Sequence, residues 1–577
     1  MIDKLKVTLA QINPTIADVV GNTQKIIECL QKGRQSNVQV MAFPEMAVIG
    51  YPAQDLLFRS EIIEANLLAI KKIAPHTKDY LTVVVGFCEP AFEKEKWRLD
   101  RQHLYNSYAL FSDGNLIGTG QKICLPNYGV FDDFRYFIPG QEAKIFDIEG
   151  IKIGVEICED LWYKNTDDDH PIYPCRPTQV LSQKGADLII VLNASPYHVG
   201  KERTKEELVT EQARENQVPI FYVNMWGAND KIIFDGNSLA ADIEGHIIAR
   251  GAGFCDDLVI CDLDLKSKVA KHIPPPPFHE EEMIYRALVT GKRDYHKKCG
   301  IHQSLVGVSG GIDSATVLAI DVAALGKENV LAILSPSRYT SKETLEDGIR
   351  LCQNLEVNYK IIPIEEQETT GCWIGSVPEK YKRFIKYFGE PKNEVVFENQ
   401  QAIDRMSILR AIANEENRLI SGTGNKSELA TGYATVCGDL QADILVIGDL
   451  YKHQVYKVAG YINELNHREI IPQTIIDRVP SAELSKDQVD PFNYHRLDKL
   501  VQLKVEEYKT NEELLSLAPE GDSNFTRDEV NTYSRLIDLN EHKRFKSGYI
   551  LKISPLAFGE ERRINTAKRV NLWEQHF

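Results

Sequence analysis

Four consecutive prolines, Pro274 to Pro277, limit what this chain can fold into more than any other feature of its sequence. Proline lacks a backbone N–H and has a fixed φ, so such a run can extend neither an α-helix nor a central β-strand. A chain of 577 residues is also too long for one hydrophobic core. We therefore predict two large domains, over residues 1–270 and 281–577, joined by a proline-rich linker at 271–280.

The first domain combines helices with a larger number of strands. Apolar runs predict strands at 5–12, 38–43, 81–87, 105–111, 115–120, 151–157, 187–193, 219–225, 238–250 and 257–263. Amphipathic spacing predicts helices at about 22–33, 60–73, 176–184 and 202–217. Because strands outnumber helices, we expect a layered α/β sandwich in which helices cover two sheets.

In the second domain, helices and strands alternate. The predicted helices are 279–298, 312–325, 342–355 and 398–417, and the predicted strands are 304–308, 329–334, 357–364 and 418–421. This alternation is typical of a parallel, doubly wound sheet. The last hundred residues look helical and polar.

Composition narrows the class of protein. The formal net charge of -16 would repel a phosphate backbone, so nucleic acid is disfavoured as the main partner. We find neither a membrane span nor a signal-peptide core, and expect a cytoplasmic protein. The 11 cysteines include no CxxC pair, which favours reduced thiols over disulfides or a zinc site.

A glycine-rich turn, Ser309 to Ser314, lies between an apolar strand and a helix. Glycines let backbone amides approach an anion, serine hydroxyls add donors, and the helix presents its positive N-terminal end to the same point. The turn matches neither GxxxxGK[ST] nor GxGxxG, so it supports neither a kinase-type NTPase nor a dinucleotide fingerprint. It predicts a pyrophosphate site, although an ordinary tight turn would have the same sequence pattern.

Three reactive residues, Glu45, Lys122 and Cys158, each follow or end an apolar strand of the first domain. In α/β proteins, ligand-binding and catalytic sites lie at the carboxyl ends of the strands. Together the three could work on an amide: Glu45 takes the thiol proton, Cys158 attacks the carbonyl, and Lys122 stabilises the oxyanion. Taken singly, each has a simpler interpretation as inert core or solvated surface.

The order of these three residues resembles the nitrilase superfamily, over residues 4–265. The stretches Lys122 to Asp132 and Cys158 to Trp162 are similar to the glutaminase domain fused to NAD synthetases. The resemblance implies an α-β-β-α sandwich that hydrolyses glutamine through a thioester. It also implies glutamine-binding residues, which are Tyr128, Glu159, Ser195 and Arg203. Asp133 stands where relatives usually carry Glu.

The SGGIDS turn resembles the loop of N-type ATP pyrophosphatases, which belong to the adenine nucleotide alpha hydrolase-like fold and split ATP between its α- and β-phosphates. The ATP-binding residues that this implies are Ser309, Gly310, Gly311, Ile312, Asp313, Ser314 and Thr423. Asp313 and Glu428 would hold Mg²⁺, a hard cation that prefers oxygen ligands. A helix cap remains the other interpretation of both carboxylates.

Further positions resemble the deamido-NAD site of NAD synthetases. They are Glu398, Asn399, Arg405, Asp439, Lys452 and Lys552. The sequence departs from that family at Ile403, where an arginine is common, over 488–494, and after Arg563.

The two halves together resemble the glutamine-dependent NAD synthetases. The resemblance implies a ligase that takes ammonia from glutamine and amidates deamido-NAD through an adenylated intermediate, giving NAD, AMP and pyrophosphate. It also implies a homo-oligomer built from dimers, up to an octamer, and we expect an internal ammonia tunnel. Three alternatives stay open: another carboxylate acceptor, a non-catalytic first domain beside an ammonia-dependent synthetase, and a tRNA-modifying enzyme, which the acidic charge disfavours.

Overall fold

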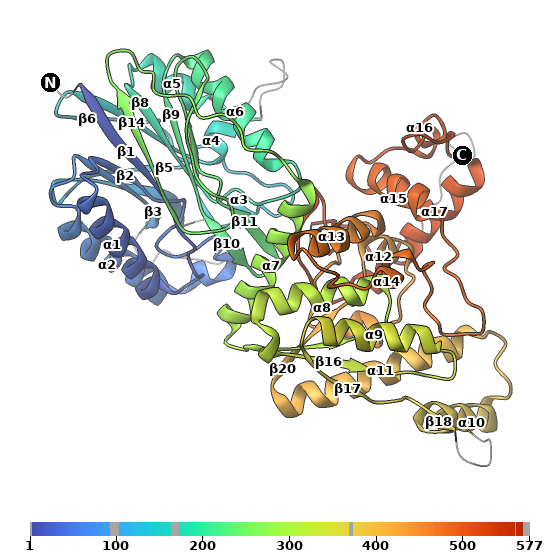
Figure 1. Ribbon diagram of the computed structural model, residues 1–577. Coiled ribbons are helices and arrows are strands. Elements are labelled where there is room, and N and C mark those ends of the chain that lie inside the picture. Colours follow the sequence, from blue (N-terminus) through green and yellow to red (C-terminus); the bar gives the residue numbers. More distant parts are fainter. Residues whose placement is uncertain (1–2, 93–102, 163–171, 368–372, 560, 569–577) are drawn as a thin grey trace. The chain divides into compact units, whose positions relative to one another are not determined.

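The computed structural model describes residues 3–92, 103–162, 172–367, 373–559 and 561–568 (Figure 1). The chain divides into two compact units, Met1–Phe278 and His279–Phe577. The division falls within the predicted linker at 271–280. None of the described helices is both long enough and apolar enough to span a bilayer.

One sheet of the N-terminal unit has the strand order β14-β1-β2-β3-β4-β5. Its strands are β1 (Lys4–Gln11), β2 (Val40–Ala42), β3 (Thr82–Pro90), β4 (Leu104–Ser112), β5 (Asn115–Gln121) and β14 (Asp257–Asp264). The strands β1, β2 and β3 are parallel, whereas β14, β4 and β5 pair antiparallel with their neighbours. Crossovers and hairpins are therefore mixed in one sheet.

The other sheet has the order β13-β12-β9-β8-β7-β6. Its strands are β6 (Ile145–Ile148), β7 (Ile151–Ile157), β8 (Leu188–Asn193), β9 (Ile220–Asn224), β12 (Leu239–Ala241) and β13 (Ile247–Arg250). The prediction of one strand over 238–250 is wrong, because Asp242 breaks it with a turn in which its carboxylate accepts from the N–H groups of Glu244 and His246. The strand β6 and the hairpin β10 (Trp226–Asn229)–β11 (Ile232–Asp235) were not predicted.

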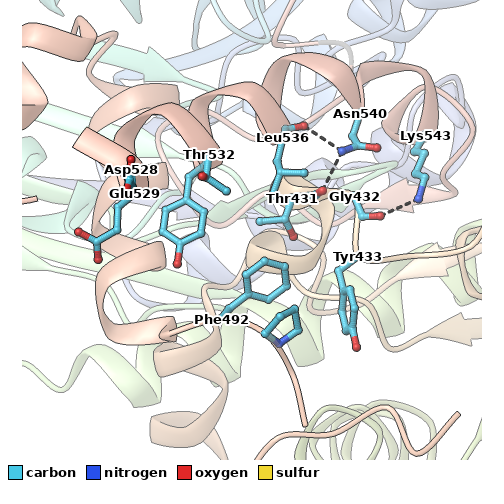
Figure 2. A pocket seen from close by; sticks show the side chains of 12 residues that line it. Thr431, Gly432, Tyr433, Phe492, Asp528, Glu529, Thr532, Leu536, Asn540 and Lys543 are labelled. Atoms are coloured by element: carbon cyan, nitrogen blue, oxygen red, sulfur yellow. Dashed lines mark hydrogen bonds between the residues drawn. The ribbon is translucent and has the colours of Figure 1, made fainter. Parts of the chain in front are cut away.

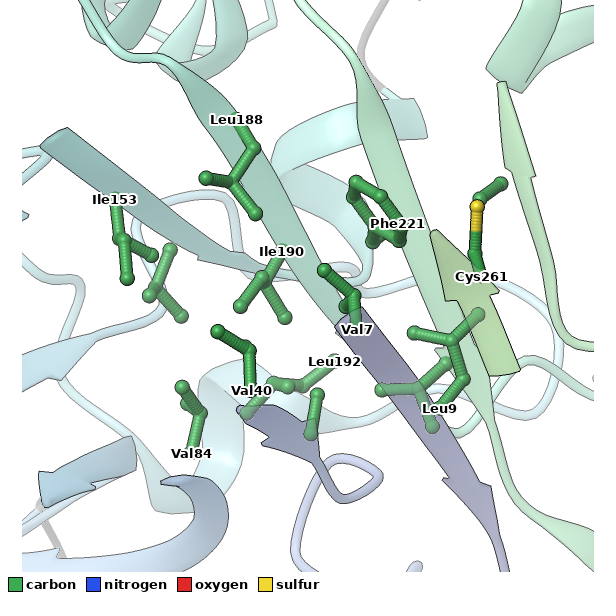
Figure 3. Close-up of a cluster of buried hydrophobic side chains, with 14 of the residues drawn as sticks. Val7, Leu9, Val40, Val84, Ile153, Leu188, Ile190, Leu192, Phe221 and Cys261 are labelled. Atoms are coloured by element: carbon green, nitrogen blue, oxygen red, sulfur yellow. The ribbon is translucent and has the colours of Figure 1, made fainter. Parts of the chain in front are cut away.

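The two sheets pack face to face through apolar side chains. Val7 and Leu9 of β1 share one buried cluster with Ile190 and Leu192 of β8 (Figure 3). Helices α1 (Val19–Gln35) and α2 (Ser60–Ile73) cover the outer face of one sheet, and α5 (Pro177–Gln183) and α6 (Lys201–Asn216) cover the other (Figure 1). Alternation along each strand buries both faces. The predicted α-β-β-α sandwich is confirmed.

The sheet of the C-terminal unit is parallel throughout, in the order β17-β16-β15-β20-β21-β22. Its strands are β15 (Gln303–Gly307), β16 (Val330–Leu334), β17 (Asn358–Ile361), β20 (Arg418–Gly422), β21 (Ile444–Leu445) and β22 (Tyr549–Ile550). The last two strands were not predicted, because two residues are too few to show a periodicity.

Helices cover both faces of this sheet. On one face, Leu409 of α11 (Val395–Glu416) packs with Leu305 of β15. On the other face, Ser304 of β15 contacts a buried ion pair between Lys292 of α7 (Glu280–Cys299) and Asp321 of α8 (Ile312–Leu325). The predicted doubly wound sheet is confirmed.

The C-terminal helices form a second apolar cluster in this unit. They are α15 (Tyr494–Val501), α16 (Asn511–Leu515) and α17 (Arg527–Leu539), and α17 is followed by the short polar helix α18 (Glu541–Arg544). Leu497, Leu500 and Val530 pack there with Leu429 of α12 (Lys426–Thr431). These helices are therefore amphipathic and enclose a core, although their sequence looks polar.

Candidate active sites

A tight turn presents Cys158 at the end of β7. Its φ is +47°, a left-handed value that is uncommon for a residue with a side chain. Its backbone N–H donates to the carbonyl oxygen of Leu192 on the parallel strand β8 (2.9 Å), and α4 (Glu159–Trp162) begins at the next residue. Strand, strained residue and helix form an elbow of the kind that exposes a nucleophile at a sheet edge.

Lys122 lies between two carboxylates. Its Nζ is 2.8 Å from Glu45 Oε1 and 2.8 Å from Asp133 Oδ2, and all three side chains are buried. Glu45 follows β2, Lys122 follows β5, and Asp133 begins the short helix α3 (Asp133–Tyr136). The other Asp133 oxygen accepts from the Tyr51 hydroxyl at 2.9 Å. The shorter acid at position 133 therefore still reaches Lys122.

Cys158 interacts electrostatically with Glu45 and Lys122. Burial raises the pKa of the Cys158 thiol well above its usual value, Glu45 raises it further, and Lys122 opposes both. Burial alone would lower the pKa of Lys122, but Asp133 and Glu45 raise it well above the usual range. Lys122 is therefore a permanent cation beside a thiol that needs a base to become nucleophilic.

Two tyrosines hold Glu159, the residue after the elbow. The Tyr128 hydroxyl donates to Oε2 at 2.9 Å, and the Tyr173 hydroxyl donates to Oε1 at 3.3 Å. Ser195 follows β8, and its backbone N–H donates to Asn224 Oδ1 at 2.9 Å. Two of the four predicted glutamine-binding residues, Glu159 and Ser195, thus follow the carboxyl ends of β7 and β8. A third, Tyr128, contacts Glu159 through its hydroxyl.

In the C-terminal unit, the glycine turn connects β15 to α8. Gly310 has a φ of +87°, and a Cβ there would lie 2.3 Å from the carbonyl oxygen of Thr344, so only glycine fits. The Gly311 N–H donates to Ser309 Oγ at 3.2 Å, and the hydroxyls of Ser309 and Ser314 are 3.1 Å apart. The loop therefore gathers hydroxyl and amide donors at the start of α8.

The turn after β20 meets the turn after β15. Asn425 donates from Nδ2 to Asp313 Oδ1 at 3.0 Å, and it also forms a capping box with Glu428 at the start of α12. The Lys452 ammonium lies 2.5 Å from Asp313 Oδ2 and 3.7 Å from Glu428 Oε1. Burial, and then the charge of Asp313, raise the pKa of Glu428 to about 8. Thr423, half-buried at the end of β20, leads into this cluster.

Three of the residues predicted for deamido-NAD lie on α11. Glu398 accepts from the Ser485 hydroxyl at 3.0 Å, and Asn399 accepts from the Thr435 hydroxyl at 2.8 Å. Arg405 donates from Nε to the carbonyl oxygen of Ser335 at 3.0 Å, and burial lowers its pKa to about 10. All three contact loops rather than neighbouring helices.

Two other residues predicted for deamido-NAD, Asp439 and Lys552, bond to groups of the protein itself. Asp439 Oδ1 accepts from the Thr435 N–H at 2.8 Å, and burial raises the pKa of Asp439 to about 6. Lys552 is buried, with its ammonium 3.0 Å from Glu561 and bonded to two main-chain carbonyl oxygens. Their contact with a substrate stays a prediction.

Known protein families match each half of the chain. Two family models match the chain, carbon-nitrogen hydrolase over residues 6–270 and NAD synthase over residues 284–547. The glutamine-dependent NAD(+) synthetase of Thermotoga maritima is 36% identical over 606 residues, covering 98% of this chain and 99% of that protein. The chain belongs to the glutamine-dependent NAD(+) synthetase family. The predicted family resemblance is thereby confirmed.

Solved structures of this family extend the similarity to the fold. The glutamine-dependent NAD+ synthetase from Acinetobacter baumannii, in complex with ADP, aligns with a TM-score of 0.75 at 34% identity, covering 97% of this chain and 98% of that chain. The enzyme from Cytophaga hutchinsonii aligns with a TM-score of 0.80 at 19% identity, covering 98% of each chain, and supports the fold alone.

Two basic residues at the start of α6, Lys201 and Arg203, differ in what their side chains contact. Arg203 is exposed, with its guanidinium 4.2 Å from the ring centroid of Phe278. The Lys201 ammonium lies 3.6 Å from the ring centroid of Trp162. Burial lowers the pKa of Lys201 to about 8, whereas the charges of Cys158 and Glu159 act to raise it. Sequence reasoning did not single out Lys201, whose local signal is its place as the first residue of α6, after Gly200.

A cavity of about 640 Å³ lies between the end of α12 and α17 (Figure 2). Its lining residues are Thr431, Gly432, Tyr433, Pro491, Phe492, Asp528, Glu529, Thr532, Tyr533, Leu536, Asn540 and Lys543. Asn540 donates to the Thr431 carbonyl oxygen at 2.8 Å, and Lys543 donates to that of Gly432 at 2.7 Å. These side chains cap the end of α12. The C-terminal helices thereby fix the helix that carries Glu428.

Proposed function

We propose that this chain is a glutamine-dependent NAD synthetase. The N-terminal unit hydrolyses glutamine to glutamate and ammonia, and the C-terminal unit uses ATP to amidate deamido-NAD, giving NAD, AMP and pyrophosphate. One observation carries the proposal: a Glu-Lys-Cys cluster and an SGGIDS turn beside two carboxylates occur in one chain that its named relatives match over nearly their full length.

The chemistry of the first site follows from its geometry. Glu45 accepts the thiol proton, Cys158 attacks the glutamine carboxamide, and Lys122 stabilises the oxyanion. Hydrolysis of the thioester then releases glutamate. Asp133 keeps Lys122 in place through its 2.8 Å contact.

Recognition of an amino acid needs two opposite charges. Glu159, held by Tyr128 and Tyr173, suits the α-ammonium of glutamine. Ser195 is the neutral polar group that we assign to the same substrate. Lys201 is the cation we assign to the α-carboxylate, in place of Arg203, because its charge interacts with both Cys158 and Glu159.

Replacing Lys201 by methionine should raise the KM for glutamine about 10- to 100-fold, because a charge-assisted hydrogen bond to the carboxylate is lost. Steady-state glutaminase assays measure this change. The matched variant is Arg203→Met, which removes an exposed cation two residues along the same helix and should change the KM less than about twofold. A larger effect at Arg203 than at Lys201 would reverse the assignment.

The second site suits a nucleotide that is cleaved at its α-phosphate. The loop Ser309 to Ser314 and the start of α8 offer donors to the pyrophosphate, and Thr423 lies near the nucleotide. Asp313 and Glu428 provide hard oxygen donors, so they fit Mg²⁺, with Lys452 as the balancing cation when the metal is absent. Bound Mg²⁺ would neutralise charge on the phosphates.

The acceptor carboxylate needs activation, because a carboxylate is a poor electrophile whereas its mixed anhydride with AMP has a good leaving group. The residues we assign to deamido-NAD are Glu398, Asn399, Arg405, Asp439, Lys452 and Lys552. Product identification by mass spectrometry, with ATP, glutamine and deamido-NAD supplied, tests the function. If another acid were amidated and no NAD formed, that acid would replace deamido-NAD as the proposed substrate.

Ammonia should pass between the sites inside the protein, because ammonium in water is unreactive. With ¹⁵N-amide glutamine and unlabelled external ammonium, we expect nearly all of the NAD formed to carry ¹⁵N. Mass spectrometry of NAD measures the ratio. Dilution of the label in proportion to external ammonium would contradict a tunnel.

We further propose a cytoplasmic homo-oligomer built from dimers. Exposed apolar side chains on the hairpin of α10 (Ser376–Phe388) and α11 support an interface, since Tyr387 and Phe388 are 68% and 78% exposed. Light scattering gives the mass in solution. A monomer at micromolar concentration would rule the oligomer out.

A further inference from the structure

Asn106 contacts both partners of the catalytic ion pair. It lies on β4, is 1% exposed, and donates from Nδ2 to Glu45 Oε1 at 2.7 Å. Its main-chain carbonyl oxygen accepts from the backbone N–H of Lys122 at 2.8 Å. Only the amide NH₂ can face a carboxylate, so the orientation of this side chain is fixed by its partner. Asn106 therefore links the general base to the segment that carries the ammonium.

The two oxygens of Glu45 are not equivalent. Oε1 accepts from both Lys122 Nζ (2.8 Å) and Asn106 Nδ2 (2.7 Å), which uses both of its lone pairs. Oε2 accepts from the backbone N–H of Ala194 at 3.1 Å. Among the described residues, this leaves one lone pair of Oε2 to receive a proton.

The remaining atom of Asn106 argues against a role in folding. Its Oδ1 is buried and has no hydrogen-bond partner among the residues that the structure describes. An unsatisfied buried acceptor is unfavourable for folding, so stability alone would favour an apolar residue here. Asparagine at this position is better explained by what its NH₂ does for Glu45.

We propose that Asn106 is a positioning residue that anchors Oε1 of Glu45 and leaves Oε2 as the proton acceptor, an inference that rests on the proposed glutaminase function. The thiol proton of Cys158 moves to Oε2, and the sulfur pair forms the bond to the carboxamide carbon. The same proton then passes from Oε2 to the nitrogen as the C–N bond breaks, so that ammonia leaves and the thioester remains. A freely rotating carboxylate would present the correct oxygen only part of the time.

The test is Asn106→Leu in the full-length enzyme, a change that keeps the branching of the side chain at Cγ and removes the donor. We expect the glutaminase kcat to fall about 100-fold, the size of a general-base contribution. The KM for glutamine should stay within about threefold, because no substrate contact of the residue is lost. Alkylation of Cys158 by iodoacetamide should slow in parallel, while ammonia-dependent NAD synthesis and the Tm stay at the wild-type level.

The matched control is Asn66→Leu. Asn66 of α2 is also fully buried, but it donates from Nδ2 to the backbone oxygen of Cys88 at 2.6 Å, away from Glu45. This variant should lower the Tm and keep the glutaminase kcat of the folded enzyme. If Asn106→Leu does not fold, Asn106→Ala makes the same measurement.

An Asn106 variant with a glutaminase kcat within about twofold of wild type would overturn the proposal that Asn106 anchors Glu45, provided that the wild type hydrolyses glutamine. An equal loss of both activities with a lowered Tm would assign Asn106 to folding instead. If the wild type does not hydrolyse glutamine at all, the proposed function fails first, so the two failures are distinguishable.

Discussion

Replacing Cys158 by alanine should lower glutamine-dependent NAD synthesis by about 10⁴-fold or more, because the thiol that forms the thioester is removed. Ammonia-dependent synthesis should persist, since the adenylating residues belong to the other compact unit. Paired assays with glutamine or ammonium as the nitrogen source measure both rates.

Cys261→Ala is the matched control for Cys158. Cys261 is a buried thiol of the same apolar cluster, and burial raises its pKa to about 12. It lies on β14, away from the elbow, so its loss should cost about 1 kcal/mol of stability and leave glutamine use intact. Equal loss of both activities in Cys158→Ala would contradict the division of labour between the units.

Asp313→Asn should lower NAD synthesis by about 100-fold or more with either nitrogen source, because one hard oxygen ligand and the ion pair with Lys452 are weakened together. Asparagine can still accept from Asn425, so the turn should stay folded. Glutaminase activity should persist. Coupled assays of AMP and glutamate release separate the two reactions.

Glu346→Gln serves as the control for Asp313, because it removes an exposed carboxylate of α9 (Lys342–Asn354) that pairs with Lys342 at 3.6 Å. It should change neither rate by more than about twofold. If Asp313→Asn kept wild-type synthesis at saturating Mg²⁺, the SGGIDS turn would lose its proposed role.

The long periodic elements could be predicted from the sequence. Helices 60–73 and 312–325 and strand 151–157 match the structure residue for residue, because each is a long apolar pattern bounded by polar residues or turns. Short elements could not be predicted in this way. β21 and β22 have two residues each, and they are strands only because a parallel neighbour supplies their hydrogen bonds.

The N-terminal site shows the same limit. Their places at the ends of apolar strands and the family resemblance indicated Glu45, Lys122 and Cys158, and the structure brings Glu45 and Lys122 within 2.8 Å. Sequence reasoning chose Arg203, whereas the structure turns that side chain towards Phe278 and holds Lys201 over Trp162. Both are basic residues at the start of one helix, and only the direction of each side chain separates them.

The sequence by itself determined both fold classes, because hydrophobic periodicity and local turn chemistry are properties of neighbouring residues. It determined the family through the resemblance of its motifs to known proteins. Only the tertiary structure decided which oxygen of Glu45 is anchored, that Asp133 still reaches Lys122, and that Lys452 lies between Asp313 and Glu428. Those contacts join residues far apart in the chain. Their distances depend on how strands and helices pack, and no local pattern encodes them.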